Sequence, residues 1–274
     1  MIRFRRVTLQ PLGAWLVDRP VAAPHRRYRL RVWREVNANF ASLREELIAY
    51  AQEALDDARL RIRKGFEDGL SPFADPVEDP AAHYPAMFNR ITLQGYLGET
   101  LAGLAVEHFG AFGKLDWHVP AYLFRFHDTE FQHLDLINER LLEGEAHDPD
   151  AVAERRPGRT GDDALAFRLD DAGIITHVLA LEAKCLVESN TGVITDAHGK
   201  LAAGQTRPSG IRELITLLSD YETEEAQAWI KRLLEHYHAG FRTAKRRDGL
   251  AYAVGAPPKR PATRVSWLPV DAPH

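Results

Sequence analysis

The feature that most constrains this chain is a stretch near its middle, in which two apolar runs are joined by one tight turn. Residues 163–169 and 174–187 are rich in apolar side chains, and the Asp-Asp-Ala-Gly sequence of residues 170–173 is typical of a turn. The second run is almost continuously apolar up to Leu181, as in strands that are covered on both faces. The sequence therefore predicts a β-hairpin whose second strand is central in its sheet.

Two charged residues, Glu182 and Lys184, stand at the end of this predicted central strand, where packing favours apolar side chains. A buried charge needs a partner of opposite charge or a metal ion. Because side chains alternate along a strand, Glu182 and Lys184 share one face, and Ala183 and Cys185 share the other. The two charged groups are therefore predicted to meet at one place.

The length of the turn decides which acidic residue faces this pair. With residues 170–173 as the loop, Asp163 pairs with Ala180, on the face that also carries Glu182. Asp163 and Glu182 are then diagonal neighbours, about 7–8 Å apart between backbones, and could share one cation. A slip of one residue would put Asp162 in this place and turn Asp163 away. We prefer Asp163.

This part of the sequence resembles the PD-(D/E)XK motif, because an acidic residue is followed by a hairpin turn and then by Glu-x-Lys. That motif defines the restriction-endonuclease-like superfamily of phosphodiesterases. The predicted order of elements is also similar to the core of that family. The predicted order is a helix at 91–109, a strand at 119–126, the hairpin, a loop that contains glycine and proline, a helix at 211–221 and a late strand. The sequence departs from the family pattern in having no proline before Asp163 and a long insertion at 127–159.

This resemblance implies an α/β fold, in which a restriction-endonuclease-like core with a central mixed sheet is flanked by helices. It also implies a metal centre. Asp163 and Glu182 would hold Mg²⁺ or Mn²⁺, with the carbonyl of Ala183 and the carboxylate of Glu99, on the first helix, as further ligands. Lys184 would orient the attacking water or stabilise developing negative charge. The expected catalytic residues are Asp163, Glu182, Lys184 and Glu99.

The activity implied by the resemblance is hydrolysis of phosphodiester bonds, with DNA favoured over RNA. Members of the superfamily serve restriction, repair and antiviral defence, so we expect a nuclease of prokaryotic defence or DNA processing that works with a partner protein such as a helicase or a sensor. The sequence has no Gly-x-x-x-x-Gly-Lys-Ser/Thr motif of an ATPase, so a motor would be a separate chain.

Basic residues in three places are candidates for binding nucleic-acid phosphates. One set alternates with apolar residues between His25 and Val32 and predicts a strand with a basic face; a second precedes the late strand; the third is a single arginine before the hairpin. A solvated surface explains the first two sets equally well. The candidates are Arg27, Arg29, Arg31, Arg159, Arg242, Lys245, Arg246 and Arg247.

The chain has 274 residues, of which 45% are hydrophobic, enough for one large domain or a core with a subdomain. Four prolines in residues 69–86 indicate a boundary. We expect an N-terminal accessory region at 1–88, with a basic strand and a long helix, and a nuclease core at 89–222. The remaining residues, 223–274, would form a C-terminal helix and strand extension that packs on the core.

The composition of the chain indicates its cellular compartment and excludes one class of metal site. No segment has the composition of a signal peptide or a membrane span, so we expect a cytoplasmic protein with no membrane partner. The single Cys185 excludes an intramolecular disulfide and a cysteine-based zinc cluster. The net charge of −4 argues against coating of nucleic acid through bulk positive charge.

Three other interpretations stay open. The Glu-x-Lys pair can be a weak ion pair at a solvated strand end. The chain can be a catalytically inactive protein that binds nucleic acid or a partner on the same fold. It can also be a histidine-dependent zinc hydrolase, although no two of its 12 histidines have a known ligand spacing; His236 and His238 are two residues apart and point to different sides of a helix.

Overall fold

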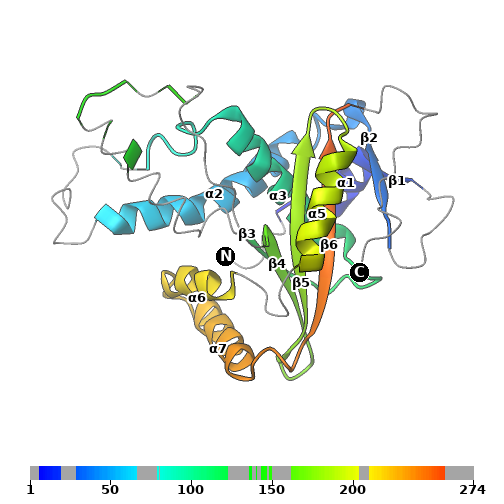
Figure 1. Cartoon of the computed structure of the whole chain (residues 1–274), viewed down its shortest axis with the longest axis vertical. Coiled ribbons are helices and arrows are strands. Elements are labelled where there is room, and N and C mark those ends of the chain that lie inside the picture. The colour runs from blue at the N-terminus through cyan, green and yellow to red at the C-terminus, as the bar shows by residue number, and fades with distance from the viewer. Residues whose placement is uncertain are drawn as a thin grey trace.

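The computed structural model describes residues 6–19, 29–66, 79, 81–122, 136–137, 140, 143–146, 148–149, 162–203 and 210–256. These residues form a mixed α/β structure, with helices packed on a β-sheet (Figure 1). Among the helices of this part of the chain, none combines the length and the apolar composition needed to cross a membrane.

A four-stranded mixed sheet lies at the centre, in the order β3-β4-β5-β6. Its strands are β3 (His118–Tyr122), β4 (Ala164–Leu169), β5 (Ile175–Leu186) and β6 (Lys245–Val254). β4 pairs antiparallel with β3 and with β5, whereas β6 runs parallel to β5. The predicted hairpin and the interior position of its second strand are therefore confirmed.

The pairing within the hairpin differs by two residues from the predicted one, because Ala180 pairs with Leu165 instead of Asp163. The turn is one residue longer than expected, because Leu169 pairs with Ile175 and not with Ile174. Within the turn, the carboxylate of Asp170 accepts a hydrogen bond of 2.8 Å from the N–H of Ile174. A β-bulge near the end of β4 adds the second step of the shift. A shift of two residues leaves every side chain on its predicted face.

One face of the sheet packs against the N-terminal half of the described structure. That half contains α1 (Leu9–Trp15), β1 (Leu16–Arg19), β2 (Val32–Glu35), the 3-10 helix η1 (Asn37–Asn39), α2 (Arg44–Phe66) and α3 (Arg90–Phe109). Asn89 caps α3, because its side chain accepts a hydrogen bond of 2.8 Å from the N–H of Thr92. Buried residues of these helices form one hydrophobic cluster with Leu179 and Leu181 of β5.

The other face of the sheet is covered by α5 (Thr191–Ala203), α6 (Ile211–Ser219) and α7 (Glu224–His238). A second hydrophobic cluster joins Val178 and Ala180 of β5 to buried residues of α6 and α7, among them Leu214 and Trp229. The threonine at position 223 caps α7 by accepting a hydrogen bond from the N–H of Ala226. In Figure 1, α5 lies across β5 and β6.

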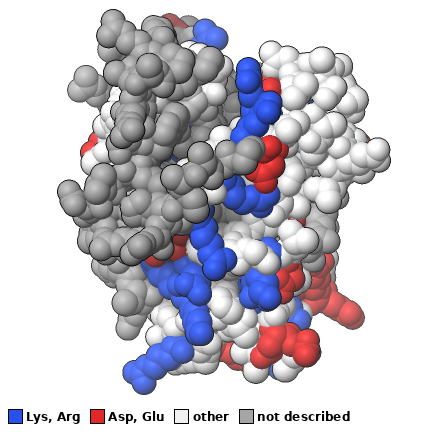
Figure 2. All heavy atoms as spheres, turned by 90° about the vertical axis from the view of Figure 1, so that its right-hand side faces the viewer, with Lys and Arg blue, Asp and Glu red and all other residues white. Residues whose placement is uncertain are grey.

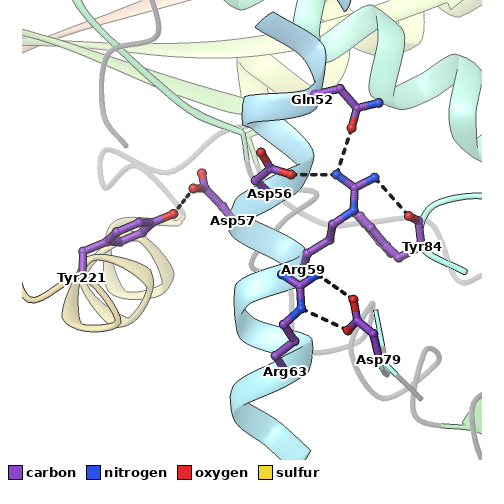
Figure 3. A network of polar contacts seen from close by, with 8 residues as sticks. All are labelled: Gln52, Asp56, Asp57, Arg59, Arg63, Asp79, Tyr84 and Tyr221. Carbon is purple, nitrogen blue, oxygen red and sulfur yellow. Dashed lines mark hydrogen bonds and ion pairs between the residues drawn. The ribbon is translucent and has the colours of Figure 1, made fainter. Parts of the chain in front are cut away.

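Helix α2 connects distant parts of the chain through polar contacts (Figure 3). The hydroxyl of Tyr221, which follows α6, donates to the carboxylate of Asp57 in α2. On another side of α2, Arg63 forms a bidentate pair with Asp79, at 3.0 and 2.7 Å. This pair holds the pKa of the Asp79 carboxyl at about 2. Such contacts tie the long helix to one segment before the central sheet and to another between β5 and β6.

The three predicted regions share hydrophobic packing. Leu43 and Tyr50 of the first region lie in the same cluster as Leu104 and Leu179 of the second. The third region supplies β6, which pairs with β5 from His177 to Leu186. The boundaries at 88 and 222 stay predictions.

Three elements differ from the expected ones. Residues 191–203 form α5, where a loop was expected. The strand with alternating arginines was expected between residues 25 and 32, but β2 begins only at Val32, and residues 20–28 lie outside the described part of the chain. Lys245, Arg246 and Arg247 form the start of β6 and do not precede it.

Candidate active site

Asp163 stands immediately before β4 and is fixed to β5 by two hydrogen bonds. Its backbone N–H donates to the carbonyl of Leu181 at 2.7 Å. Its carboxylate oxygen Oδ2 accepts from the backbone N–H of Ala183, also at 2.7 Å. The two bonds hold Asp163 to the residues on either side of Glu182, so the two acidic residues are neighbours across the hairpin and not diagonal.

Lys184 connects the two carboxylates. Its ammonium nitrogen Nζ lies 2.5 Å from Oε1 of Glu182 and 3.8 Å from Oδ2 of Asp163. It also donates to the carbonyl of Ala183 at 3.1 Å. The structure therefore brings together the side chains of Asp163, Glu182 and Lys184, at the end of the strand where the sequence predicted that charged groups meet.

The three side chains differ in their exposure to solvent. Glu182 is only 1% exposed, although it carries a charge. The side chains of Asp163 and Lys184 are 13% and 24% exposed, so the cluster opens to solvent on their side. A second ammonium group, Nζ of Lys200 in α5, lies 3.1 Å from the same Oε1 of Glu182. Two lysines thus balance the two carboxylates, which makes burial of Glu182 tolerable.

A second polar group lies on the same face of the sheet. Arg246 of β6 pairs in register with Val178, on the face that carries Ala180 and Glu182. Its guanidinium lies 3.6 Å from Asp162 and 2.8 Å from Asp248. Asp162 was expected to point to the opposite side of the sheet. It lies outside β4, which begins at Ala164, and its carboxylate contacts Arg246 of β6.

Glu99 belongs to α3, which reaches β5 through the residue before it. The preceding residue, Gly98, packs against Cys185, so closely that a Cβ at Gly98 would lie 2.8 Å from that of Cys185. Because Cys185 alternates with Lys184 in β5, α3 packs on the sheet face opposite to Lys184. Glu99 is 2% exposed and lies in this buried layer. The resemblance suggests Glu99 as a metal ligand, and that role stays a prediction.

Few groups in this cluster could act as ligands of a metal ion. Within the described ranges, no three His, Cys, Asp or Glu side chains are placed to hold a metal ion together. The oxygens on hand are the carboxylates of Asp163 and Glu182 and the carbonyl of Ala183. Oxygen donors suit a hard cation, and Mg²⁺ is often held by only one or two carboxylates, with water and substrate phosphate completing the shell. The residues present therefore fit Mg²⁺ or Mn²⁺, provided that Lys184 moves away from Glu182.

Other candidate groups are held in structural environments. His236 is buried, with Nδ1 3.1 Å from the hydroxyl of Thr243 and its ring edge-on to Phe241 at 5.0 Å. Burial lowers the pKa of His236. Burial also raises the pKa of the Cys185 thiol, which disfavours the thiolate that a nucleophile requires.

The candidate phosphate-binding residues lie in different surroundings. Arg31 donates to the carbonyl of Phe109 at 2.7 Å and stacks over Trp33 at 4.6 Å, so it connects β2 to the end of α3. The partly buried Arg246 faces Asp162, as described above. Arg31 is exposed, as are Arg29, Arg242, Lys245 and Arg247, the last of which lies over the ring of Phe112 at 5.4 Å. Arg27 and Arg159 lie outside the described residues.

One face of the molecule carries a mixture of basic and acidic side chains. On the side of the molecule that is to the right in Figure 1, Lys and Arg atoms run down the face in a band, with Asp and Glu atoms beside it (Figure 2). The face is mixed in charge, as expected from a chain with a net charge of −4. Phosphate binding there would depend on individual basic residues and not on a uniformly positive surface.

Comparison with known proteins does not add a family. No family model matches the chain, and a search of curated proteins found no similar sequence.

Sequence reasoning missed Lys200 as a partner of Glu182, and it did not place Arg246, a candidate phosphate-binding residue, beside Asp162. Lys200 belongs to α5, which contains Gly192 and Gly199 and was expected to be a loop. A helical stripe of Ile194, Ala197 and His198, all buried, was the signal that could have identified the helix. Arg246 could not be assigned because its partners depend on the parallel pairing of β6 with β5.

Proposed function

We propose that this chain is a metal-dependent nuclease that hydrolyses phosphodiester bonds of DNA, with Asp163, Glu182 and Lys184 as its catalytic residues. One observation carries the proposal: the ammonium nitrogen of Lys184 lies within 4.0 Å of carboxylate oxygens from both acidic residues. These residues come from adjoining strand ends and lie on one face. Such an arrangement supplies oxygen ligands for a cation and a positive charge for a phosphate at the same place.

Each residue has a distinct role in the proposed reaction. A bound Mg²⁺ or Mn²⁺ ion would polarise the phosphodiester and lower the pKa of the attacking water. The carboxylates of Asp163 and Glu182 would hold that ion, with the Ala183 carbonyl beside them. Lys184, released from Glu182, would donate hydrogen bonds from Nζ to a phosphate oxygen and stabilise its developing negative charge. The Ala183 N–H keeps the Asp163 carboxylate in position throughout.

A second candidate is a catalytically inactive protein that binds nucleic acid or a protein partner. It is favoured by the contacts of Lys184, which already sits between the two carboxylates as a cation would. In such a protein the cluster would serve stability alone, and divalent ions would have no effect on DNA.

The cellular role that we propose is prokaryotic defence or DNA processing, together with a partner protein such as a helicase or sensor. This part of the proposal follows from the resemblance of the sequence motif to the PD-(D/E)XK superfamily, whose members serve these processes. Co-purification of the tagged chain from its own cells, with and without nuclease treatment, separates protein partners from those bound through DNA.

The test is a cleavage assay with supercoiled plasmid, single-stranded DNA and RNA, each in Mg²⁺, Mn²⁺ or EDTA. We expect DNA cleavage that requires the divalent ion and falls about 100-fold or more in Glu182→Ala and Lys184→Ala. The control is Glu225→Gln, which removes an exposed carboxylate in α7, away from the cluster. Full activity in both active-site variants would reject the site, and the absence of metal-dependent cleavage in the wild type would favour the second candidate.

A further inference from the structure

Lys200 lies in the last turn of α5, the helix that crosses β5 and β6 (Figure 1). Its Nζ donates to Oε1 of Glu182 at 3.1 Å, the same oxygen that accepts from Lys184. Two ammonium groups from different elements therefore meet at one buried carboxylate oxygen. The resemblance to the nuclease family assigned no role to this helix.

The position of α5 is fixed by packing and by its first residues. Ile194, Ala197 and His198 are buried along one side of the helix. At its start, the backbone N–H of Asn190 donates to the hydroxyl of Tyr252, the β6 residue that pairs with Lys184, at 2.8 Å. The contact between Lys200 and Glu182 is thus set by the placement of the helix as well as by a flexible side chain.

The two lysines differ in what they can reach. Lys184 is 24% exposed and contacts both carboxylates and a backbone carbonyl. Lys200 is 53% exposed, so its ammonium faces Glu182 on one side and solvent on the other. An anion that approaches from solvent can contact Lys200 without displacing buried groups. A divalent cation at Glu182 would also take over the charge that Lys200 now neutralises.

We propose that Lys200 is a substrate-binding residue of this site, whose ammonium binds a phosphate of the DNA backbone beside the scissile one. Glu182 holds the ammonium over the site until a divalent cation replaces it. This inference rests on the proposed nuclease function. Lysine acts on phosphate as a compact point charge, so the contact contributes to affinity without reading sequence.

The test is binding of a short fluorescent DNA duplex, measured by anisotropy at several salt concentrations. Ca²⁺ takes the place of Mg²⁺, and a gel verifies that the duplex stays intact. For Lys200→Gln we expect the Kd to rise about tenfold. The slope of log K against log salt should become less steep by about one, because one phosphate contact is lost. Lys200→Arg should keep the wild-type slope.

The control is Lys231→Gln, which removes an exposed lysine of α7 and should leave both quantities unchanged. Mn²⁺ binding by calorimetry gives a readout that does not involve DNA. Because Lys200 competes with the cation for Glu182, Lys200→Gln should bind Mn²⁺ as tightly as the wild type or more tightly. Weaker Mn²⁺ binding would show that Lys200 only supports the cluster, and would overturn the proposal.

The outcomes also separate this inference from the proposed function. If the wild type cleaves DNA and Lys200→Gln binds it with unchanged Kd and salt slope, Lys200 is not a phosphate-binding residue, while the nuclease assignment stands. If the wild type neither binds nor cleaves DNA in any divalent ion, both are rejected.

Discussion

The backbone N–H of Ala183 donates a hydrogen bond of 2.7 Å to the carboxylate of Asp163. Ala183 lies between Glu182 and Lys184 in β5, so this bond fixes the acid of one strand against both charged residues of the next. The bond from the Asp163 N–H to the Leu181 carbonyl holds the other side of Glu182. The convergence of the three groups is therefore set by the backbone as well as by the side chains.

Two substitutions of Asp163 separate its chemical role from its structural one. Asparagine keeps an oxygen that can accept from the Ala183 N–H, whereas alanine leaves that donor unsatisfied. We expect Asp163→Asn and Asp163→Ala both to lose metal-dependent DNA cleavage. Only Asp163→Ala should also lose stability, by about 1–3 kcal/mol in the free energy of unfolding, measured with urea. Wild-type cleavage by Asp163→Asn would remove this residue from the site.

Removing Lys184 should destabilise the protein, because Glu182 is 1% exposed and, of the residues that the structure describes, would keep only Lys200 as an ion-pair partner. For Lys184→Met we expect a loss of about 3 kcal/mol in the free energy of unfolding. Adding Glu182→Gln should restore part of it, since the buried charge is then gone. A double-mutant cycle measures this coupling. Additive effects of the two substitutions would show that the pair is not coupled.

Gly98 is where α3 approaches β5 most closely, and a Cβ there would lie 2.8 Å from the Cβ and 3.3 Å from the backbone nitrogen of Cys185. Gly98→Ala must push the helix from the strand that carries Glu182 and Lys184, at a cost of about 1–3 kcal/mol. Gly95→Ala is a matched control in the same helix, because nothing lies within 4 Å of its Cβ. It should stabilise the protein by up to about 1 kcal/mol. Thermal unfolding compares the two, and equal effects would contradict the close packing.

Burial of His236 predicts how stability depends on pH. Its folded pKa lies below the ordinary value of 6.5, so the unfolded chain binds a proton more readily than the native one. The free energy of unfolding should therefore be highest above pH 6.5 and fall as the pH decreases toward the folded pKa. Burial lowers the pKa of His177 as well, so His236→Asn should remove part of this dependence and not all of it.

Urea unfolding between about pH 5 and pH 8 measures this dependence. His238→Asn, which changes an exposed histidine of the same helix, is the control. An identical pH dependence in the wild type and His236→Asn would contradict the assignment of this effect to burial of His236.

The spacing of apolar residues within a segment was enough to predict several of the helices and strands. The hairpin, α2, α3 and α7 follow from alternating or helical spacing of apolar residues. The face shared by Asp163, Glu182 and Lys184 was also predicted, although the pairing was off by two residues. The bulge in β4 and the longer turn at Asp170 caused this difference, and neither has a clear signal in the sequence.

The other parts of the cluster depend on contacts between distant segments. Lys200 reaches Glu182 only because α5 packs over β5, and Arg246 faces Asp162 only because β6 pairs in parallel with β5. The position of Glu99 also depends on contacts between distant segments. Its helix was predicted correctly, but the sheet face on which that helix packs is set by the fit of Gly98 against Cys185.

The most direct measurement is plasmid cleavage by the wild type and by Glu182→Gln, side by side, in Mg²⁺ and in EDTA. Glutamine keeps the shape of this buried side chain and removes only its charge. We predict Mg²⁺-dependent cleavage by the wild type and none above background by Glu182→Gln, with both proteins folded. Equal cleavage by the two proteins, or cleavage by the wild type in EDTA, would contradict this prediction.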